Sequence, residues 1–188
     1  MKTIKNFLYV VFVILLSFSF ANAQEYDMQK AMELASPNEN HQRLETDFGG
    51  AWTYSMTSTM DGMTMTGTGS SSSRMILGGR FIMMEAEGTM MGMNVKSITI
   101  MGYDNALEKY TMIGLDELGT YYITAAGDYD PVTKVYTLDG TYEEPVLKKI
   151  QDYRFTMDLS DAALPVVKVL FENEQGGWDE IMSMTYSR

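Results

Sequence analysis

The chain has 188 residues, of which 25 are Asp or Glu and 14 are Lys or Arg, so its formal net charge is −11. It contains no cysteine, which excludes disulfide bonds, thiolate metal sites, a cysteine nucleophile and the acylated cysteine of a lipoprotein. An acidic surface without a cluster of Lys and Arg repels phosphate groups, so nucleic acid is not an expected partner.

The first 23 residues have the order of a secretory signal peptide. Lys2 and Lys5 precede an apolar run over residues 7–20, and Ala21-Asn22-Ala23 offers the small residues that a signal peptidase needs. The apolar run is shorter than the about 20 residues of a membrane-spanning helix. We therefore expect cleavage after Ala23, export to the periplasm or the cell exterior, and no membrane span in the mature chain. An uncleaved membrane anchor is the alternative.

A short helix is predicted directly before the main domain. Residues 24–35 form an N-terminal segment with a weak helical pattern, and Ser36-Pro37-Asn38-Glu39 then has the order of a helix start. Ser36 would be the N-cap, Pro37 would lie in the first turn, and Glu39 would close a capping box. Gly49-Gly50 ends the helix.

His41, Leu44 and Phe48 share one face of this helix, because they are spaced at i, i+3 and i+7. His41 is the chain's one histidine. It has no visible partners for a zinc site or a Ser-His-Asp triad, so we expect it to cap or pack at the mouth of the domain, with haem ligation as the alternative.

Beyond Gly50 the apolar period changes from about 3.6 to 2, and turn signals return roughly every ten residues. After a first strand containing Trp52, Tyr54 and Met56 on one face, further strands are predicted over 63–77, 80–87, 94–103, 109–116, 120–128, 134–142, 146–159, 166–174 and 178–188. The short connections favour antiparallel neighbours. We therefore expect an all-β fold over residues 36–188: a single antiparallel up-and-down β-barrel of about ten strands, calycin-like, with a short N-terminal helix. An open sandwich is the alternative.

In the last predicted strand, Trp178, Met182, Met184 and Tyr186 share a face with Arg188. Together with Gly50-Ala51-Trp52 at the first strand, this resembles the calycin pattern of lipocalins and their relatives. The resemblance implies that Arg188 packs across Trp52 at the closed end of the barrel. A planar guanidinium lies well on an indole face.

A second resemblance covers nearly the whole mature chain. It rests on an ordered set of motifs: His41-x-x-Leu44, Gly50-x-Trp52, Gly78-Gly79-Arg80-Phe81, Gly88-Thr89-Met90-Met91-Gly92-Met93, Gly102-Tyr103-Asp104-Asn105, and Asp116 followed by Gly119-Thr120. Together these resemble a family of exported bacterial proteins of unknown function, which implies a calycin-like barrel and no particular reaction. Gly114 stands where the family pattern has a tryptophan, and the resemblance implies extra room in or beside the barrel there.

Methionine and tyrosine are the side chains most suited to line a cavity, since the chain has 18 Met and 12 Tyr. We expect a small, largely apolar ligand inside the barrel and no metal or other cofactor. The residues expected to line its site are Tyr54, Met56, Met84, Met112, Tyr122, Tyr153, Phe155, Met182 and Met184. Copper bound by thioethers such as Met63 and Met65 is the alternative for the methionine-rich strands.

Two other functions remain open at this stage. One is an interaction module that works through its outer surface, which would show as an exposed apolar patch. The other is a hydrolase or isomerase that uses carboxylates, for which Asp116 and Glu85 are the first candidates. The pairs Glu85/Glu87 and Asp116/Glu117 are more typical of a solvated sheet face, and Asp116 is suited to order a turn. We expect no catalytic residue.

Overall fold

The computed structural model describes residues 27–60, 62–90, 92–144 and 148–188, so the predicted signal peptide lies outside the described residues. The chain divides into two units after Ala35. In the first unit, α2 (Met28–Ala35) has no buried residue, and the Asp27 carboxylate accepts the backbone N–H of Lys30 at 3.0 Å. Within the described residues, neither helix is long and apolar enough to cross a membrane.

The second unit begins with α3 (Glu39–Phe48), which confirms the predicted helix but changes its cap. Asn38, and not Ser36, is the N-cap, and its side chain accepts the backbone N–H of Asn40 at 3.0 Å. His41, and not Glu39, closes the capping box by accepting the backbone N–H of Asn38 at 3.1 Å. An Asn side chain caps as well as a Ser hydroxyl, so the N-cap lies two residues later than predicted and Pro37 stays outside the helix. Burial lowers the pKa of His41.

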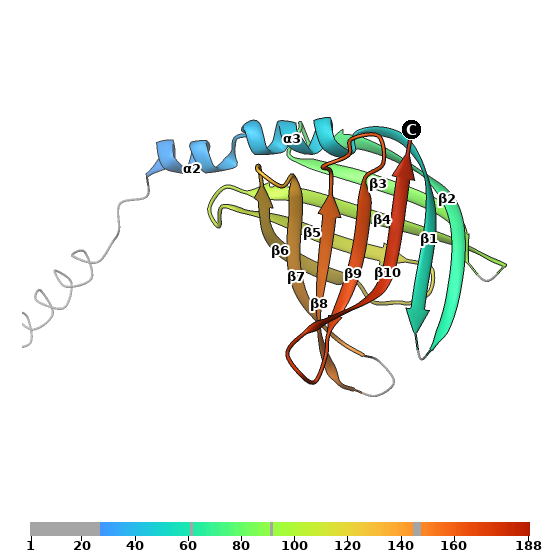
Figure 1. Cartoon of the computed structure of the whole chain (residues 1–188). Helices are drawn as coiled ribbons and strands as arrows, with labels where there is room; N and C mark the ends of the chain where they lie inside the picture. The colour runs from blue at the N-terminus through green and yellow to red at the C-terminus, as the bar shows by residue number, and fades with distance from the viewer. Residues whose placement is uncertain (1–26, 61, 91, 145–147) are drawn as a thin grey trace, which may run out of the picture. The chain divides into compact units, whose positions relative to one another are not determined.

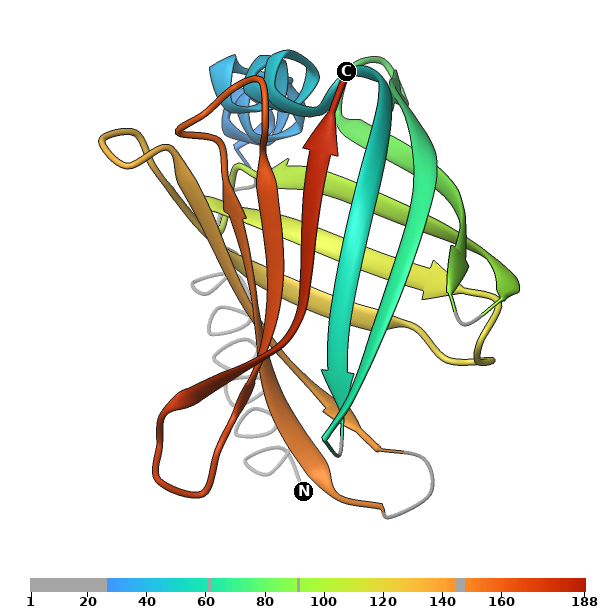
Figure 2. The ribbon, with the colours of Figure 1, turned by 45° about the vertical axis from the view of Figure 1, so that its right-hand side comes forward.

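Ten strands follow, and each is hydrogen-bonded to its neighbours in the sequence. They are β1 (Gly50–Met60), β2 (Met63–Ile76), β3 (Phe81–Met90), β4 (Met93–Asp104), β5 (Lys109–Asp116), β6 (Ile123–Asp130), β7 (Val135–Glu143), β8 (Ile150–Asp158), β9 (Val166–Glu172) and β10 (Trp178–Ser187). All pairs are antiparallel, and β1 pairs with β10 to close the barrel (Figure 2). The predicted all-β, antiparallel up-and-down barrel of ten strands is confirmed, and closure leaves no free sheet edge in it.

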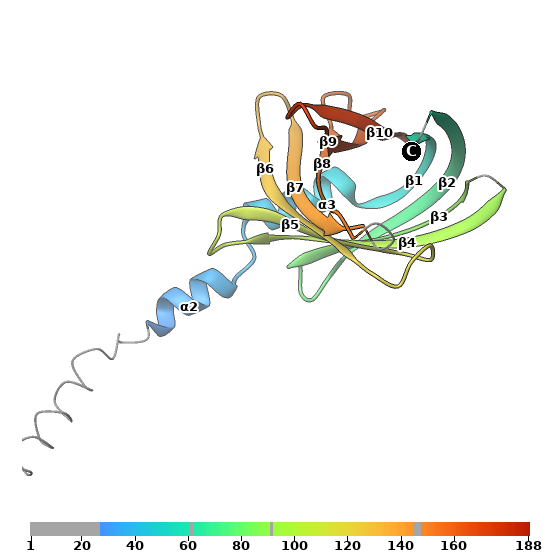
Figure 3. The same ribbon diagram turned by 90° about the horizontal axis from the view of Figure 1, so that it is seen from below.

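One end of the barrel is covered by α3, which packs against β2, β3 and β4 (Figure 1). The β2–β3, β4–β5, β6–β7 and β8–β9 connections and the C-terminus lie at this same end, because the strands alternate in direction. The view from the opposite end looks between the strands toward α3 (Figure 3). We call the α3 side the closed end.

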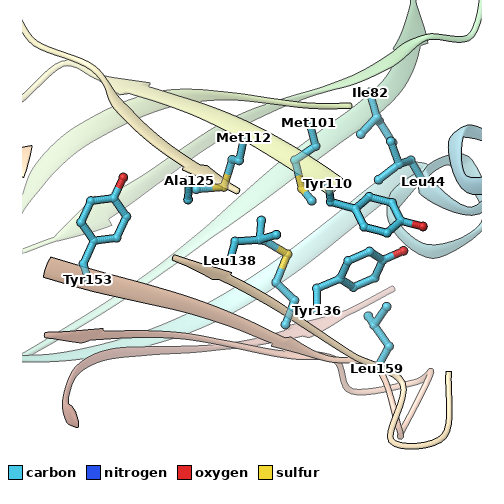
Figure 4. Close-up of a cluster of buried hydrophobic side chains, with 11 residues drawn as sticks. Leu44, Ile82, Met101, Tyr110, Met112, Ala125, Tyr136, Leu138, Tyr153 and Leu159 are labelled. Carbon is cyan, nitrogen blue, oxygen red and sulfur yellow. The ribbon is translucent and has the colours of Figure 1, made fainter. Parts of the chain in front are cut away.

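The hydrophobic core lies inside the barrel on the side of β3 to β8 and extends from Leu44 of α3 to Tyr153 (Figure 4). Leu44 of α3, Ile82, Met101, Tyr136 and Leu138 are its fully buried residues. The rings of Tyr110 and Tyr136 meet edge to face, with centroids 4.8 Å apart. Their hydroxyls reach α3, where Tyr136 donates to Asp47 at 2.7 Å. The core therefore occupies part of the barrel and anchors the helix that covers it.

The last strand departs from its predicted alternation at a β-bulge between Glu180 and Met182. A bulge adds one residue to the strand, so the residues before it point to the opposite side of the sheet from the side that strict alternation predicts. Trp178 consequently lies on the outer face, where the guanidinium of Arg154 stacks 4.2 Å from its ring centroid and also binds Asp139. The prediction that Trp178 shares a face with Met184 and Arg188 is wrong for this reason.

Candidate functional site

A cavity of about 170 Å³ lies inside the barrel beneath α3. It is bounded by α3, by the loop between β8 and β9, and by the inner faces of every strand except β6 and β7. Its lining residues are Asp47, Phe48, Trp52, Tyr54, Ser71, Ser73, Met84, Ala86, Ser97, Thr99, Met112, Phe155, Met157, Leu159, Pro165, Val167, Met184 and Tyr186.

One wall of this cavity carries hydroxyl groups. Ser71 and Ser73 of β2 and Ser97 and Thr99 of β4 line it, with β3 between the two strands. None of these four hydroxyls hydrogen-bonds to another described residue, although Ser73 is buried. The run Ser70–Ser73 lies within the strand predicted over 63–77 and is fully paired with β1 and β3. Alternate serines therefore present unused donors and acceptors to the interior, and we call these four residues the hydroxyl wall.

The rest of the strand lining is mostly apolar and aromatic, and it begins directly beside the hydroxyl wall, where Trp52 pairs with Ser71. Trp52, Tyr54, Phe155, Met184 and Tyr186 contribute to it, and the Tyr54 and Tyr186 rings lie with centroids 5.5 Å apart. Burial raises the pKa of Tyr54, and it raises the pKa of Tyr186 to about 12, so both phenols are neutral at pH 7. Such a surface suits a largely apolar ligand with a few polar groups.

At the closed end, Asp47 brings a carboxylate to the cavity from the last turn of α3. It accepts the Tyr136 hydroxyl, and no cationic group in the described part of the chain lies within ion-pair distance of it. Arg43, one helical turn earlier, stacks 4.5 Å from the ring centroid of Tyr129 and lines a separate hollow of about 200 Å³. Sequence reasoning did not single out Asp47, although it follows Leu44 by three residues and so lies near the buried helix face.

Trp52 and Arg188 meet at the closed end, as the calycin resemblance implies. The Arg188 guanidinium lies 4.2 Å from the Trp52 ring centroid and donates to the carbonyl of Gly49 at 3.3 Å. The Trp52 indole N–H donates to the carbonyl of Phe48 at 3.1 Å. These contacts tie the last strand and the first strand to the end of α3, and they fix the indole that forms part of the cavity wall.

Replacing Arg188 by alanine is expected to lower the free energy of unfolding by about 1 kcal/mol, because a cation–π contact is worth about 0.5–1 kcal/mol at an exposed site. Arg74→Ala is the matched control. It removes a solvent-exposed ion pair with Glu85 and should cost under about 0.5 kcal/mol. Urea denaturation of the two variants measures the difference, and equal stabilities would show that the stacking contributes nothing.

Five of the nine predicted ligand-lining residues line the cavity: Tyr54, Met84, Met112, Phe155 and Met184. Met56 and Met182 lie on the same inner strand faces, one pleat further from α3 than Tyr54 and Met184. Tyr153 packs in the core instead, where its hydroxyl donates to the carbonyl of Thr124 at 2.6 Å.

The prediction that Tyr122 lines the cavity is wrong. Tyr122 is 65% exposed and precedes β6. Ile123 and Ala125 of that strand pack in or against the core, so Tyr122 is out of phase with the inner face. Gly114 lies opposite Ile123, whose side chain comes within 3.0 Å of the position of a Cβ at Gly114. The room implied at Gly114 is therefore partly occupied by Ile123.

The carboxylates considered for catalysis lie outside the barrel. Glu85 is 3.8 Å from Arg74, and the Asp116 carboxylate accepts the backbone N–H of Leu118 at 2.8 Å, which is the turn role expected for it. The same outer surface exposes Ile98, Ile113 and Leu115 by 39%, 42% and 43%. Among the described residues, no group of three or more His, Asp and Glu side chains is placed to hold a metal ion.

Comparison with known proteins assigns the chain to a family. The family model of a protein of unknown function, DUF1579, matches residues 36–188. The chain belongs to the DUF1579 family. No curated protein matches it. Among solved structures, the DUF1579 barrel is similar to the S-type phycobiliprotein lyase CPES from Guillardia theta, with 9% identity, 77% of this chain and 89% of that chain covered, and a TM-score of 0.51.

This similarity shows a shared barrel fold and extends no further. The family assignment agrees with the motif resemblance in that the family is one of unknown function.

Proposed function

We propose that the barrel is a non-enzymatic carrier or sensor that binds a small, largely apolar molecule in the cavity beneath α3. The observation that supports this most strongly is the mixed lining of the cavity. The hydroxyl wall offers unused hydrogen-bonding groups, and the neighbouring residues of the lining offer aromatic and thioether surface. Ligand sites generally combine an apolar lining with a few polar groups that fix orientation.

The cavity volume limits the size of the ligand. At about 170 Å³ it is smaller than the roughly 300–1,000 Å³ of drug-sized sites, but it exceeds a cavity of about 150 Å³ that accepts benzene in another protein. A single ring or a short branched chain with one polar substituent therefore suits the site. The predicted signal peptide supports a role in the periplasm or at the cell exterior.

The carrier proposal is tested by filling the cavity. Benzyl alcohol is the probe, since it joins one apolar ring to one hydroxyl, and Ala86→Leu adds volume at a lining position. We expect the variant to weaken binding at least about tenfold, because the added side chain occupies the space of the ring. Heteronuclear NMR titration measures affinity and locates the perturbed residues.

Ala126→Leu is the matched control, because Ala126 is exposed on the outer face of β6 and does not line the cavity. It should bind benzyl alcohol as the wild type does. Equal binding by Ala86→Leu, or perturbations confined to the outer surface around Ile98 and Leu115, would refute the proposal and favour a surface interaction. Native mass spectrometry of the protein purified from its own host would then identify any molecule that it retains.

A further inference from the structure

Charge is distributed unevenly around the cavity. Of the described residues that line it, Asp47 alone has a charged side chain, and the others are apolar, aromatic or hydroxyl-bearing. The hydrogen bond from Tyr136 uses one acceptor position of the carboxylate, which leaves the remaining lone pairs available. The cavity therefore has one fixed negative charge and, within the described residues, no fixed positive charge.

The position of Asp47 in its helix strengthens this negative potential. The C-terminal end of a helix carries the negative end of the macrodipole, where a basic side chain is favourable and an acidic one is not. The last turn of α3 has no basic residue and contains Asp47. Carboxylate and helix dipole thus act in the same direction at the closed end of the cavity.

Arg43 is four residues from Asp47, a spacing that would allow an ion pair, but the two interact only beyond ion-pair distance. Its guanidinium is stacked on Tyr129 and lines the separate hollow, whereas Asp47 lines the barrel cavity. The hydroxyl of Tyr110 donates to Asn40 at 3.2 Å on the Arg43 side, and that of Tyr136 donates to Asp47. Arg43 and Asp47 therefore line different hollows.

We infer that the cavity selects a protonated organic amine with a small apolar body. This rests on the proposed function and names its ligand class. The ammonium group donates to the Asp47 carboxylate, a charge-assisted hydrogen bond that is roughly twice as strong as a neutral one. The hydroxyl wall accepts N–H groups that the carboxylate does not, and the ring or chain lies against Trp52, Tyr54 and Met184. The net charge of −11 further attracts cations toward the protein.

A matched pair of probes tests this inference. Benzylamine and benzyl alcohol have the same size and differ in a protonated amine against a neutral hydroxyl. We expect the wild type to bind benzylamine at least about tenfold more tightly than benzyl alcohol, because the charge-assisted bond forms only with the amine. Isothermal titration at pH 7 measures both affinities, and NMR locates both probes in the cavity.

Three variants test whether the preference for benzylamine comes from the Asp47 side chain. Asp47→Asn should lower benzylamine affinity about tenfold while changing benzyl alcohol affinity by less than about threefold. Glu45→Gln removes the same charge from an exposed position of α3 and should leave the preference intact. Tyr136→Phe keeps the carboxylate and should keep the preference, which supplies a second test where Asp47→Asn does not fold.

The outcomes separate the two proposals. Equal affinities of the wild type for the two probes would overturn the amine inference and leave the cavity proposal standing. Loss of the preference in Glu45→Gln would also overturn it, because a general charge effect would then explain the selectivity. Binding of neither probe would refute both.

Discussion

The protein should unfold steeply between about pH 10 and pH 12, because its core buries neutral tyrosines. Tyr110, Tyr136 and Tyr153 are only 3%, 0% and 2% exposed. Burial is the largest cause that raises the pKa of each, and the Asp47 carboxylate further raises that of Tyr136. Folded pKa values thus lie above the value of about 10 for an unfolded tyrosine.

The direction of the pH effect follows from these shifts. Below about pH 10 the three phenols are protonated in both states, so their contribution to stability is fully present. Between this value and its raised folded pKa, each tyrosine keeps its proton in the core while the unfolded chain releases it, which lowers the free energy of unfolding by at most about 1.4 kcal/mol per pH unit. Three such groups remove at most about 4 kcal/mol per unit, against a total of about 5–15 kcal/mol for a typical domain.

Tyrosinate absorbance and far-UV circular dichroism, followed together, measure this transition. The part of the tyrosinate absorbance that comes from the core should appear at the same pH as the loss of the circular-dichroism signal, since core tyrosines ionise only on unfolding. Tyr153→Phe should make the decline shallower by at most about 1.4 kcal/mol per pH unit, while Tyr122→Phe, at an exposed position, should not alter it. Full tyrosinate absorbance in a chain that keeps its β-sheet signal would contradict the argument.

The barrel could be predicted because its signals are local. Turn residues such as Asp61-Gly62 separate segments whose apolar residues alternate, and each segment pairs with the next one along the chain. Trp52 and Arg188 could be placed together only through a family resemblance. The face of Trp178 could not be predicted, because the bulge that reverses it is set by the pairing of β10 with β9.

The candidate site was predicted less well, since a barrel interior depends on which side chains meet across it. Tyr54 and Met184 could be assigned from strand alternation, and both line the cavity. Tyr153 has the same pattern, yet it packs into the core rather than the cavity. Asp47 is a polar residue of a short helix, and its position at the cavity follows only from the way α3 covers the barrel (Figure 1). The hydroxyl wall was not predicted, because Ser71, Ser73, Ser97 and Thr99 are polar and give no apolar alternation that would mark them as inward-facing.

Gly127→Ala is expected to lower the free energy of unfolding by about 3 kcal/mol, since overpacking a filled interior forces the backbone to move. Gly127 lies in β6 opposite Tyr110 and Leu138. A Cβ there would overlap the carbonyl oxygen of Thr137 and lie 2.9 Å from the Cα of Leu138. Both atoms belong to the backbone of the adjacent strand, so rotation of a side chain cannot relieve the contact.

Gly114→Ala is the matched control: it makes the same substitution in the neighbouring strand β5, where side-chain atoms rather than backbone atoms surround the new methyl group. The nearest atoms to its Cβ would be side-chain carbons of Ile123 at 3.0 and 3.3 Å, which can shift by rotation. The loss of chain freedom in the unfolded state offsets part of that cost, so stability should change by less than about 1 kcal/mol. Urea denaturation compares the two variants. A Gly127→Ala protein as stable as Gly114→Ala would show that β6 and β7 can separate without loss, and that the β6–β7 side of the barrel is not packed as tightly as these contacts require.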